Sequence, residues 1–215
     1  MGDLVQLVSP VALTLTLCMF LAGMPSCIQI AKLRSVGNVP FLPFIMTEVN
    51  SLLWFSYGLL TSNWTLIICN AVGFSLQALY IVIYITFAKP KTKTLQQTWA
   101  AFIFLLGAYV YLTRFVDSSE TMISHLGLLG SSLTLMMYGS PLLEVMEVVR
   151  TGDTSCISLI MTTAQMMSAS AWFLLGVLLN DGFIFGPNIP GIISGLARFL
   201  CLYIYRGAKS DIKVD

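Results

Sequence analysis

Charged residues are scarce in this sequence of 215 residues. Only 10% of them are Asp, Glu, Lys or Arg, whereas 57% are hydrophobic. A typical soluble domain has about 25% charged residues, which cover its water-facing surface. The composition therefore excludes a soluble globular protein and indicates a chain whose main solvent is lipid.

The side chains that catalysis and metal binding use are also few. Histidine occurs once, and the five cysteines are scattered without metal-ligand spacing or a disulfide pattern. The sequence has no His-Glu-x-x-His motif, no pair of catalytic aspartates and no glycine-rich phosphate loop. We therefore expect no catalytic residue, no metal site and no cofactor. The net charge of +1 gives no reason to expect a nucleic acid partner.

Long hydrophobic runs are what the sequence has in abundance. About 20 apolar residues in a helix cross the hydrocarbon core of a bilayer. Seven runs of about this length are present, at residues 7–30, 41–61, 65–88, 97–116, 125–149, 157–179 and 186–205. The sequence therefore predicts an all-α membrane protein with seven transmembrane helices, and it leaves no room for a separate soluble domain.

The basic residues are distributed unevenly between the two ends of these helices. Nine of them fall in the first, third and fifth connections and in the tail: Lys32, Arg34, Lys89, Lys91, Lys93, Arg150, Arg206, Lys209 and Lys213. Arg114 borders the opposite side, and Arg198 lies within the last helix. Because basic residues concentrate in cytosolic loops, the N-terminus is predicted to lie outside or in the lumen and the C-terminus in the cytosol.

The two halves of the sequence repeat the same features in the same order. Matches at an offset of 116 or 118 residues are Gly23-Met24-Pro25 with Gly139-Ser140-Pro141, Arg34 with Arg150, Trp54 with Trp172, Gly58 with Gly176, and Asn70-Ala71-Val72-Gly73 with Asn188-Ile189-Pro190-Gly191. We predict a first triple-helix repeat at residues 1–92, a linker helix at 93–120 and a second triple-helix repeat at 121–215. One repeat plus the linker makes four crossings, so the two repeats have the same orientation in the membrane.

This combination resembles the SWEET family of sugar transporters, which is built from MtN3/saliva repeats, and it is most similar to the animal members. The resemblance rests on Gly-x-Pro in the first helix of each repeat, Asn-x-x-Gly in the third, and the run from Asn50 to Gly58, and it covers about residues 5–206. Transporters with parallel repeats, this family among them, bind substrate near the midplane between the halves and alternate its access. The resemblance implies facilitative, bidirectional transport of a glucose-like or sucrose-like sugar. It also implies a multi-pass protein of the plasma membrane, with the Golgi membrane as the alternative, and it leaves a homo-oligomer open.

Four uncharged residues are the candidates for the sugar site. Asn70 and Asn188 offer hydrogen-bond donors and acceptors, while Trp54 and Trp172 offer flat faces for the C–H groups of a sugar. From pattern alone the asparagines could equally join helices beside a close-packing glycine, and the tryptophans could lie at the membrane interface. The resemblance implies sugar contact for all four. The family often has a smaller residue at the position of Trp54, which predicts a narrower or differently selective pocket.

Proline marks three helices of the predicted bundle. Pro25, Pro43 and Pro141 match a family tetrad that is thought to let the cytosolic halves of the helices bend, and the fourth position is Ser158 instead of proline. Proline removes a backbone hydrogen bond, so each position is predicted to be a static kink or a hinge. Serine can bend a helix by bonding back to a carbonyl, although its presence puts a symmetric four-hinge mechanism in doubt.

The resemblance also implies an extracellular gate formed by Tyr57 and Asp181. A phenol that donates to a carboxylate forms a charge-assisted hydrogen bond. Without the family, both residues would be interpreted as ordinary interface residues.

Three ionisable residues fall within predicted spans, where charge is expensive. Glu144 and Arg198 lie on the cytosolic halves of their helices, so we expect them to pair or to reach the interface. Glu48 lies about two turns into its helix, and it either modulates transport or has a structural partner.

Glu48 also favours an alternative function, a proton-coupled exporter of small solutes of the proline-glutamine loop type. Against it, Ser26 follows Pro25 and Leu142 follows Pro141, so both proline-glutamine dipeptides are missing. A membrane scaffold that carries no solute is a further alternative.

Overall fold

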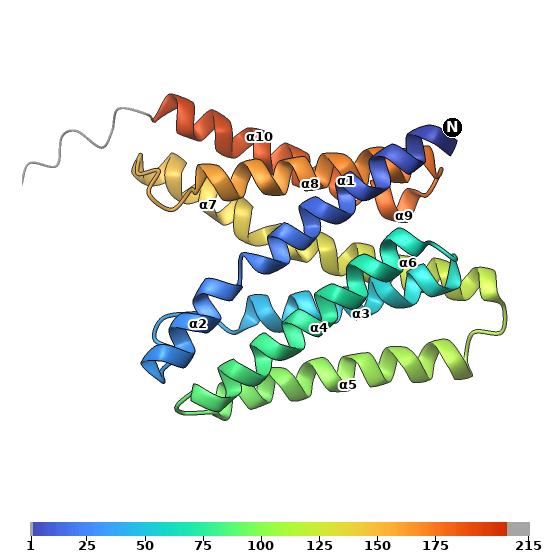
Figure 1. The fold of residues 1–215 in the computed structure, drawn as a ribbon, viewed down its shortest axis with the longest axis horizontal. Coiled ribbons are helices and arrows are strands. Elements are labelled where there is room, and N and C mark those ends of the chain that lie inside the picture. The colour runs from blue at the N-terminus through green and yellow to red at the C-terminus, as the bar shows by residue number, and fades with distance from the viewer. Residues whose placement is uncertain (1, 206–215) are drawn as a thin grey trace, which may run out of the picture. The chain divides into compact units, whose positions relative to one another are not determined.

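The computed structural model describes residues 2–205, and this part of the chain forms ten helices and no strand (Figure 1). The helices are α1 (Gly2–Leu21), α2 (Met24–Leu33), α3 (Leu42–Leu60), α4 (Trp64–Phe87), α5 (Thr92–Arg114), α6 (Ser119–Met137), α7 (Gly139–Thr151), α8 (Leu159–Leu178), α9 (Gly182–Phe185) and α10 (Asn188–Ile204). The predicted all-α architecture is therefore confirmed.

Six stretches of the described chain are long and apolar enough to cross a membrane. They are Gly2–Leu33, Trp64–Phe87, Thr92–Arg114, Ser119–Thr151, Leu159–Leu178 and Gly182–Ile204. Each overlaps one of the predicted spans. The remaining span, predicted at residues 41–61, corresponds to α3, which has 19 residues. Polar residues such as Glu48 and Asn50 interrupt the apolar run of α3.

Two of the predicted spans are not single helices. The span predicted at 7–30 is interrupted between α1 and α2, and the span predicted at 125–149 is interrupted at Tyr138, between α6 and α7. Pro25 is the second residue of α2 and Pro141 the third residue of α7. A proline has no N–H to continue the helical ladder, yet it is tolerated in a first turn, where that N–H has no partner in the helix. The prolines therefore begin new helices at these two places.

Contacts divide the described chain into two units. The central unit comprises residues 16–133, and the terminal unit comprises residues 2–15 and 134–205. In the central unit α3 packs along α4, while α2 packs on α4 and α5 on α3. In the terminal unit α10 packs on α7 and α8, and α9 packs on α8. The start of α1 belongs to the terminal unit, where Val8 and Ala12 form a buried cluster with Ala171 and Leu175 of α8.

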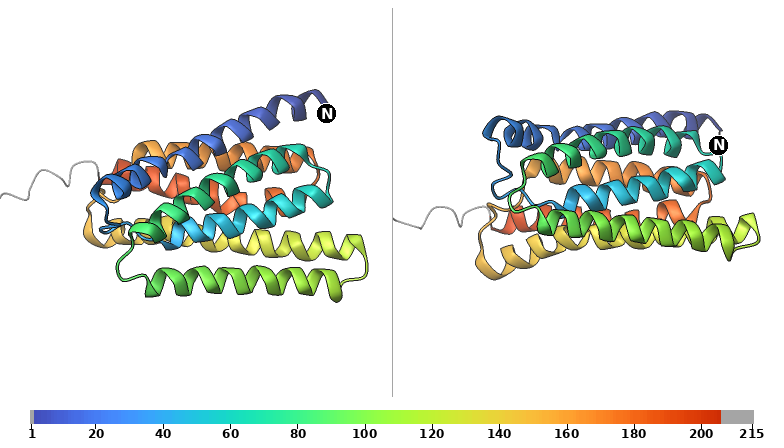
Figure 2. Two further views of the ribbon diagram at one scale, coloured as in Figure 1. Left: turned by 60° about the horizontal axis from the view of Figure 1, so that its bottom comes forward. Right: turned by 90° about the horizontal axis from the view of Figure 1, so that it is seen from below.

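Basic residues gather at one end of the central unit. The α2–α3 and α4–α5 connections both lie at this end, while the α3–α4 and α5–α6 connections lie at the other (Figure 2). Five exposed basic residues border the first end: Lys32, Arg34, Lys89, Lys91 and Lys93. Arg114, also exposed, lies at the other end. Three further basic residues of the predicted cytosolic side lie outside the described residues: Arg206, Lys209 and Lys213.

Repeat-equivalent glycines allow close helix approach in both units. A Cβ on Gly58 of α3 would lie 2.9 Å from Cβ of Leu66 in α4. A Cβ on Gly176 of α8 would lie 2.9 Å from Cβ of Phe185 in α9. Both distances are too short for a real side chain, so the matched glycines make equivalent contacts in the two repeats.

Candidate functional site: the predicted sugar-binding residues

The two asparagines of the predicted site have the same local geometry. Asn70 lies in α4 with 7% of its surface exposed, and its Nδ2 donates to the carbonyl oxygen of Leu66 at 2.9 Å. Asn188 begins α10, is partly buried, and donates from Nδ2 to the carbonyl oxygen of Ile184 at 2.7 Å. Each bond runs to the fourth residue before the asparagine. An amide has a second N–H and a carbonyl oxygen, so each side chain can still offer a donor and an acceptor to a hydroxyl group.

The glycine of each Asn-x-x-Gly motif lies against an aromatic ring. A Cβ on Gly73 would lie 2.5 Å from Cε2 of Phe20, which is close to the end of α1. A Cβ on Gly191 would lie 2.5 Å from Cζ of Tyr138, at the break between α6 and α7. In both repeats the third helix therefore packs closely against the helix break, and the neighbouring asparagine is held at this contact.

The two tryptophans of the predicted site are packed within their units. Trp54 is 8% exposed, and its ring meets that of Tyr57 edge-on with centroids 5.4 Å apart. On its other neighbour, Gly130, a Cβ would lie 3.2 Å from Cε2 of Trp54. Trp172 is partly buried and packs against the cluster that joins α1 to α8. Both indoles are therefore held by neighbouring side chains, as a binding surface for a sugar requires.

The four predicted hinge residues all lie where helices begin. Pro25 and Pro43 are second residues of α2 and α3, and Pro141 is the third residue of α7. Ser158 is the N-cap of α8, where its Oγ accepts a hydrogen bond from the N–H of Met161 at 3.4 Å. The serine therefore caps its helix from the residue before the first turn, whereas the three prolines lie within the first turns of theirs.

The predicted gate residues have different surroundings. Tyr57 lies in the last turn of α3 and is 2% exposed. Asp181 is the N-cap of α9, and its Oδ1 accepts from the backbone N–H groups of Phe183 at 3.0 Å and Ile184 at 3.2 Å. This cap was missed in the sequence, although an aspartate directly before a helix is a typical N-cap signal.

Glu144 and Arg198 form an ion pair, which is one of the two alternatives that the sequence left open for them. Nη1 of Arg198 lies 3.3 Å from Oε2 of Glu144, and the arginine is only 4% exposed. Its Nη2 also donates to Oε1 of Gln165 at 2.5 Å. The guanidinium thus joins α7, α8 and α10. Gln165 had no signal in the sequence, because a single glutamine in an apolar span shows no spacing pattern.

Glu48 has no such partner. It lies in α3 with 9% of its surface exposed, and its Oε2 is buried without a hydrogen bond to any described residue. The alternative of a structural partner for Glu48 therefore finds no support among residues 2–205.

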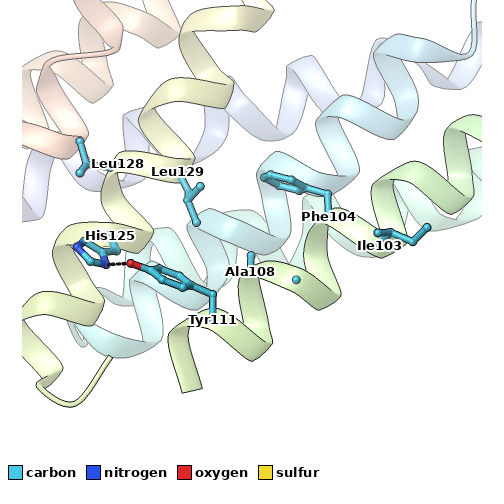
Figure 3. Close-up of a pocket in the computed structure, with 8 residues that line it drawn as sticks. Ile103, Phe104, Ala108, Tyr111, His125, Leu128 and Leu129 are labelled. Atoms are coloured by element: carbon cyan, nitrogen blue, oxygen red, sulfur yellow. Dashed lines mark hydrogen bonds between the residues drawn. The ribbon is translucent and has the colours of Figure 1, made fainter. Parts of the chain in front are cut away.

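An apolar groove of about 470 Å³ lies between α5 and α6 (Figure 3). It is lined by Ile103, Phe104, Gly107, Ala108, Tyr111, His125, Leu128 and Leu129. Figure 3 shows the Tyr111 hydroxyl and the His125 ring pointing at each other, with Oη and Nδ1 joined by a hydrogen bond of 3.0 Å. Because these two polar groups satisfy each other and the other lining residues are apolar, the groove does not suit a sugar. No residue of the predicted sugar site lines it.

Comparison with known proteins places this geometry in a family. Residues 6–92 and 124–210 each match the family described as sugar efflux transporter for intercellular exchange. The chain is 40% identical to the rat protein named sugar transporter SWEET1 over 190 residues, which are 88% of this chain and 86% of the relative. It is 39% identical to the human protein of the same name over 204 residues, which are 95% of this chain and 92% of the relative.

A solved structure has the same fold. The structure of a eukaryotic SWEET transporter at 3.7 Å resolution matches with a TM-score of 0.83 and covers 94% of this chain and 96% of the other, at 21% identity. Together with the match over both repeats, this confirms the family resemblance that the sequence motifs indicated. The chain belongs to the family of sugar efflux transporters for intercellular exchange.

Proposed function

We propose that this protein moves mono- or disaccharides across a membrane passively, in both directions, by alternating access. The observation that carries the proposal is the family match over both repeats, because this family consists of sugar transporters and not of enzymes. The rat and human relatives are named as sugar transporters. The apolar helices make the chain an integral, multi-pass membrane protein.

The sugar contacts proposed are those of Asn70, Asn188, Trp54 and Trp172. A sugar is neutral and rich in hydroxyl groups, so its site needs uncharged donors and acceptors, because ionised groups within a span are costly. The equal bonding of the two asparagines, each to the carbonyl four residues earlier, supports equal roles in the two repeats. The indole of Trp54, fixed against Tyr57, is proposed to narrow the pocket.

The moving parts are proposed to follow the repeat organisation. Residues 1–92 and 121–215 are the two triple-helix repeats and residues 93–120 the linker. Pro25, Pro43, Pro141 and Ser158 are the hinges, each at the start of a helix that can tilt as a unit.

The gate and the orientation complete the proposal. Tyr57 and Asp181 close the extracellular side. The exposed basic residues at one end of the central unit support a cytosolic location for that end. The host membrane is the plasma membrane, with the Golgi membrane as the second candidate, and assembly into a homo-oligomer is compatible with the proposal.

Uptake of radiolabelled glucose into proteoliposomes tests the function. We expect uptake that stops when the inner and outer sugar concentrations are equal, with or without a pH gradient. Accumulation above the outside concentration that follows the gradient would instead support the proton-coupled exporter, for which the buried Glu48 is the favouring observation. If glucose, sucrose and other sugars all show no flux, the membrane scaffold that carries no solute would be the remaining alternative.

A further inference from the structure

Two buried side-chain oxygens on neighbouring helices of the central unit have no hydrogen-bond partner among the described residues. They are Oε2 of Glu48 in α3 and Oε1 of Gln77 in α4. The two residues are 9% and 6% exposed. Because buried polar atoms in folded proteins nearly always have a partner, two such oxygens on adjacent helices call for an explanation.

The packing of α3 on α4 brings these residues to the same level. The helices are antiparallel neighbours, and a Cβ on Gly73 would lie 3.0 Å from Oγ of Ser51. Glu48 precedes Ser51 by three residues and Gln77 follows Gly73 by four, so each lies about one turn further along the same helix face.

A second contact between α3 and α4 lies on the other side of Glu48 and Gln77. One turn beyond Glu48 and Gln77, the rings of Phe44 and Tyr80 have centroids 6.1 Å apart. Glu48 and Gln77 therefore lie at the same level of the helix pair, between two observed contacts of α3 with α4.

Among residues 2–205 no Lys or Arg forms an ion pair with Glu48. The helices that pack against α3 in this unit carry the following ionisable or titratable side chains: Cys18 of α1, Cys27 and Lys32 of α2, Cys69, Tyr80 and Tyr84 of α4, Lys93, Tyr109, Tyr111 and Arg114 of α5, and Glu120 and His125 of α6. Lys32 is exposed near the end of α2. Tyr57 is on α3 itself. Lys93 and Arg114 are exposed near the two ends of α5. The hydroxyl groups of Tyr80 and Tyr84 donate to the carbonyl oxygens of Phe20 and Val39.

An ionised carboxylate at this position would face the amide oxygen of Gln77 with no counter-charge in a low-dielectric span. One proton removes both difficulties. It neutralises the carboxylate, and the resulting O–H is the donor that the amide oxygen lacks.

We propose that Glu48 and Gln77 form a proton-binding site, in which the carboxylic acid donates its O–H to Oε1 of Gln77 and holds α3 to α4. The proton comes from the aqueous phase and binds a carboxylate oxygen, and rotation of the two flexible side chains closes the hydrogen bond. Loss of the proton leaves a buried, unpaired charge between the helices that carry Trp54 and Asn70. Sugar flux therefore falls at alkaline pH on both sides of the membrane, and this second consequence rests on the proposed function.

Infrared spectroscopy of the reconstituted protein tests the site without any transport. At neutral pH the wild type has a carboxylic-acid C=O band that Glu48→Gln lacks and that Gln77→Leu shifts. Glu144→Gln is the matched control and keeps the band, because it leaves Glu48 and Gln77 unchanged and removes only the partner of Arg198. A wild-type spectrum without a band assignable to Glu48 would overturn the proposal.

Thermal unfolding gives a second readout. Unfolding breaks the proposed hydrogen bond between Glu48 and Gln77, so the proposed site contributes to stability only while its proton is bound. Stability therefore falls as pH rises. The melting temperature of Glu48→Gln should lose this dependence, whereas a dependence on sodium at fixed pH would show that a metal cation occupies the site and would overturn the proposal.

Flux measurements link the site to transport. In proteoliposomes with equal pH on both sides, wild-type glucose flux should fall severalfold between mildly acidic and alkaline pH, while Glu48→Gln should carry the same flux throughout. Equal pH profiles for the two proteins would contradict the link. If no protein carries sugar, the proposed function fails, and the infrared result still decides the proton site.

Discussion

The two repeats hold their intramembrane carboxylates in opposite ways. In the second repeat Glu144 pairs with the buried guanidinium of Arg198. In the first repeat Glu48 forms no ion pair with any residue that the structure describes. The residue equivalent to Arg198 at the offset of 118 is Tyr80, whose hydroxyl donates to the carbonyl oxygen of Phe20 at 3.3 Å. One fold can therefore neutralise a buried acid with a fixed cation or with a proton, and only the second choice responds to pH.

The asparagines show the opposite relation. Asn70 and Asn188 make the same bond in both repeats, and each stands near a glycine that lies under an aromatic ring. Features that contact a shared substrate are expected to stay equal in the two repeats, whereas features that set stability or regulation can diverge. The predictions below test this division.

The largest effect is expected at the asparagines. Asn70→Ala and Asn188→Ala should each reduce glucose flux to the background level, because each leaves sugar hydroxyl groups without a partner, at a cost of about 1–3 kcal/mol per group. Uptake is measured alongside surface abundance, which should be unchanged. Asn38→Ala, in the exposed connection before α3, is the matched control and should keep wild-type flux. Full flux in either pocket variant would remove that residue from the site.

The ion pair should affect stability more than transport. Glu144→Leu leaves the guanidinium of Arg198 buried without its carboxylate and should lower the free energy of unfolding by about 3–5 kcal/mol. The double variant Glu144→Leu with Arg198→Met removes both charges and should recover much of the loss. Denaturation in detergent measures both values.

Glu147→Leu provides the control for this pair on the same helix. Glu147 and Arg150 are bridged at 3.0 Å, but with side-chain exposures of 48% and 77%. Its loss should change the free energy of unfolding by no more than about 1 kcal/mol. If Glu144→Leu and Glu147→Leu lower the free energy of unfolding equally, the pair of Glu144 and Arg198 contributes no more to stability than the exposed pair.

The smallest effect is expected at the fourth hinge. Ser158→Pro should fold and carry sugar, since the position has φ −86° at the start of a helix and is equivalent to the prolines of the other hinges. Loss of the cap to Met161 should cost about 1 kcal/mol. Expression, melting temperature and flux measure the outcome, and a misfolded variant would contradict the assigned register.

The sequence predicts the spans, the repeat and the family well, because apolar length, spaced motifs and basic residues are one-dimensional signals. It leaves two alternatives for Glu144 and Arg198, to pair or to reach the interface, and the structure shows that they pair.

Other features depend on tertiary contacts and were missed. The interruption of the first span before Pro25 was not distinguished from a bend, because a proline permits either. The parts played by Gln165 and Gln77 come from partners on other helices, which an apolar pattern does not encode. The cap formed by Asp181 was missed because this residue was interpreted only as a gate residue of the family.

Glucose counterflow in proteoliposomes tests the central claim most directly. Vesicles loaded with unlabelled glucose are diluted into a trace of labelled glucose at equal pH. The account predicts a transient accumulation of label in wild-type vesicles and none with Asn188→Ala, because one carrier site must face both sides in turn. Wild-type vesicles without this transient, or a full transient in the variant, would contradict it.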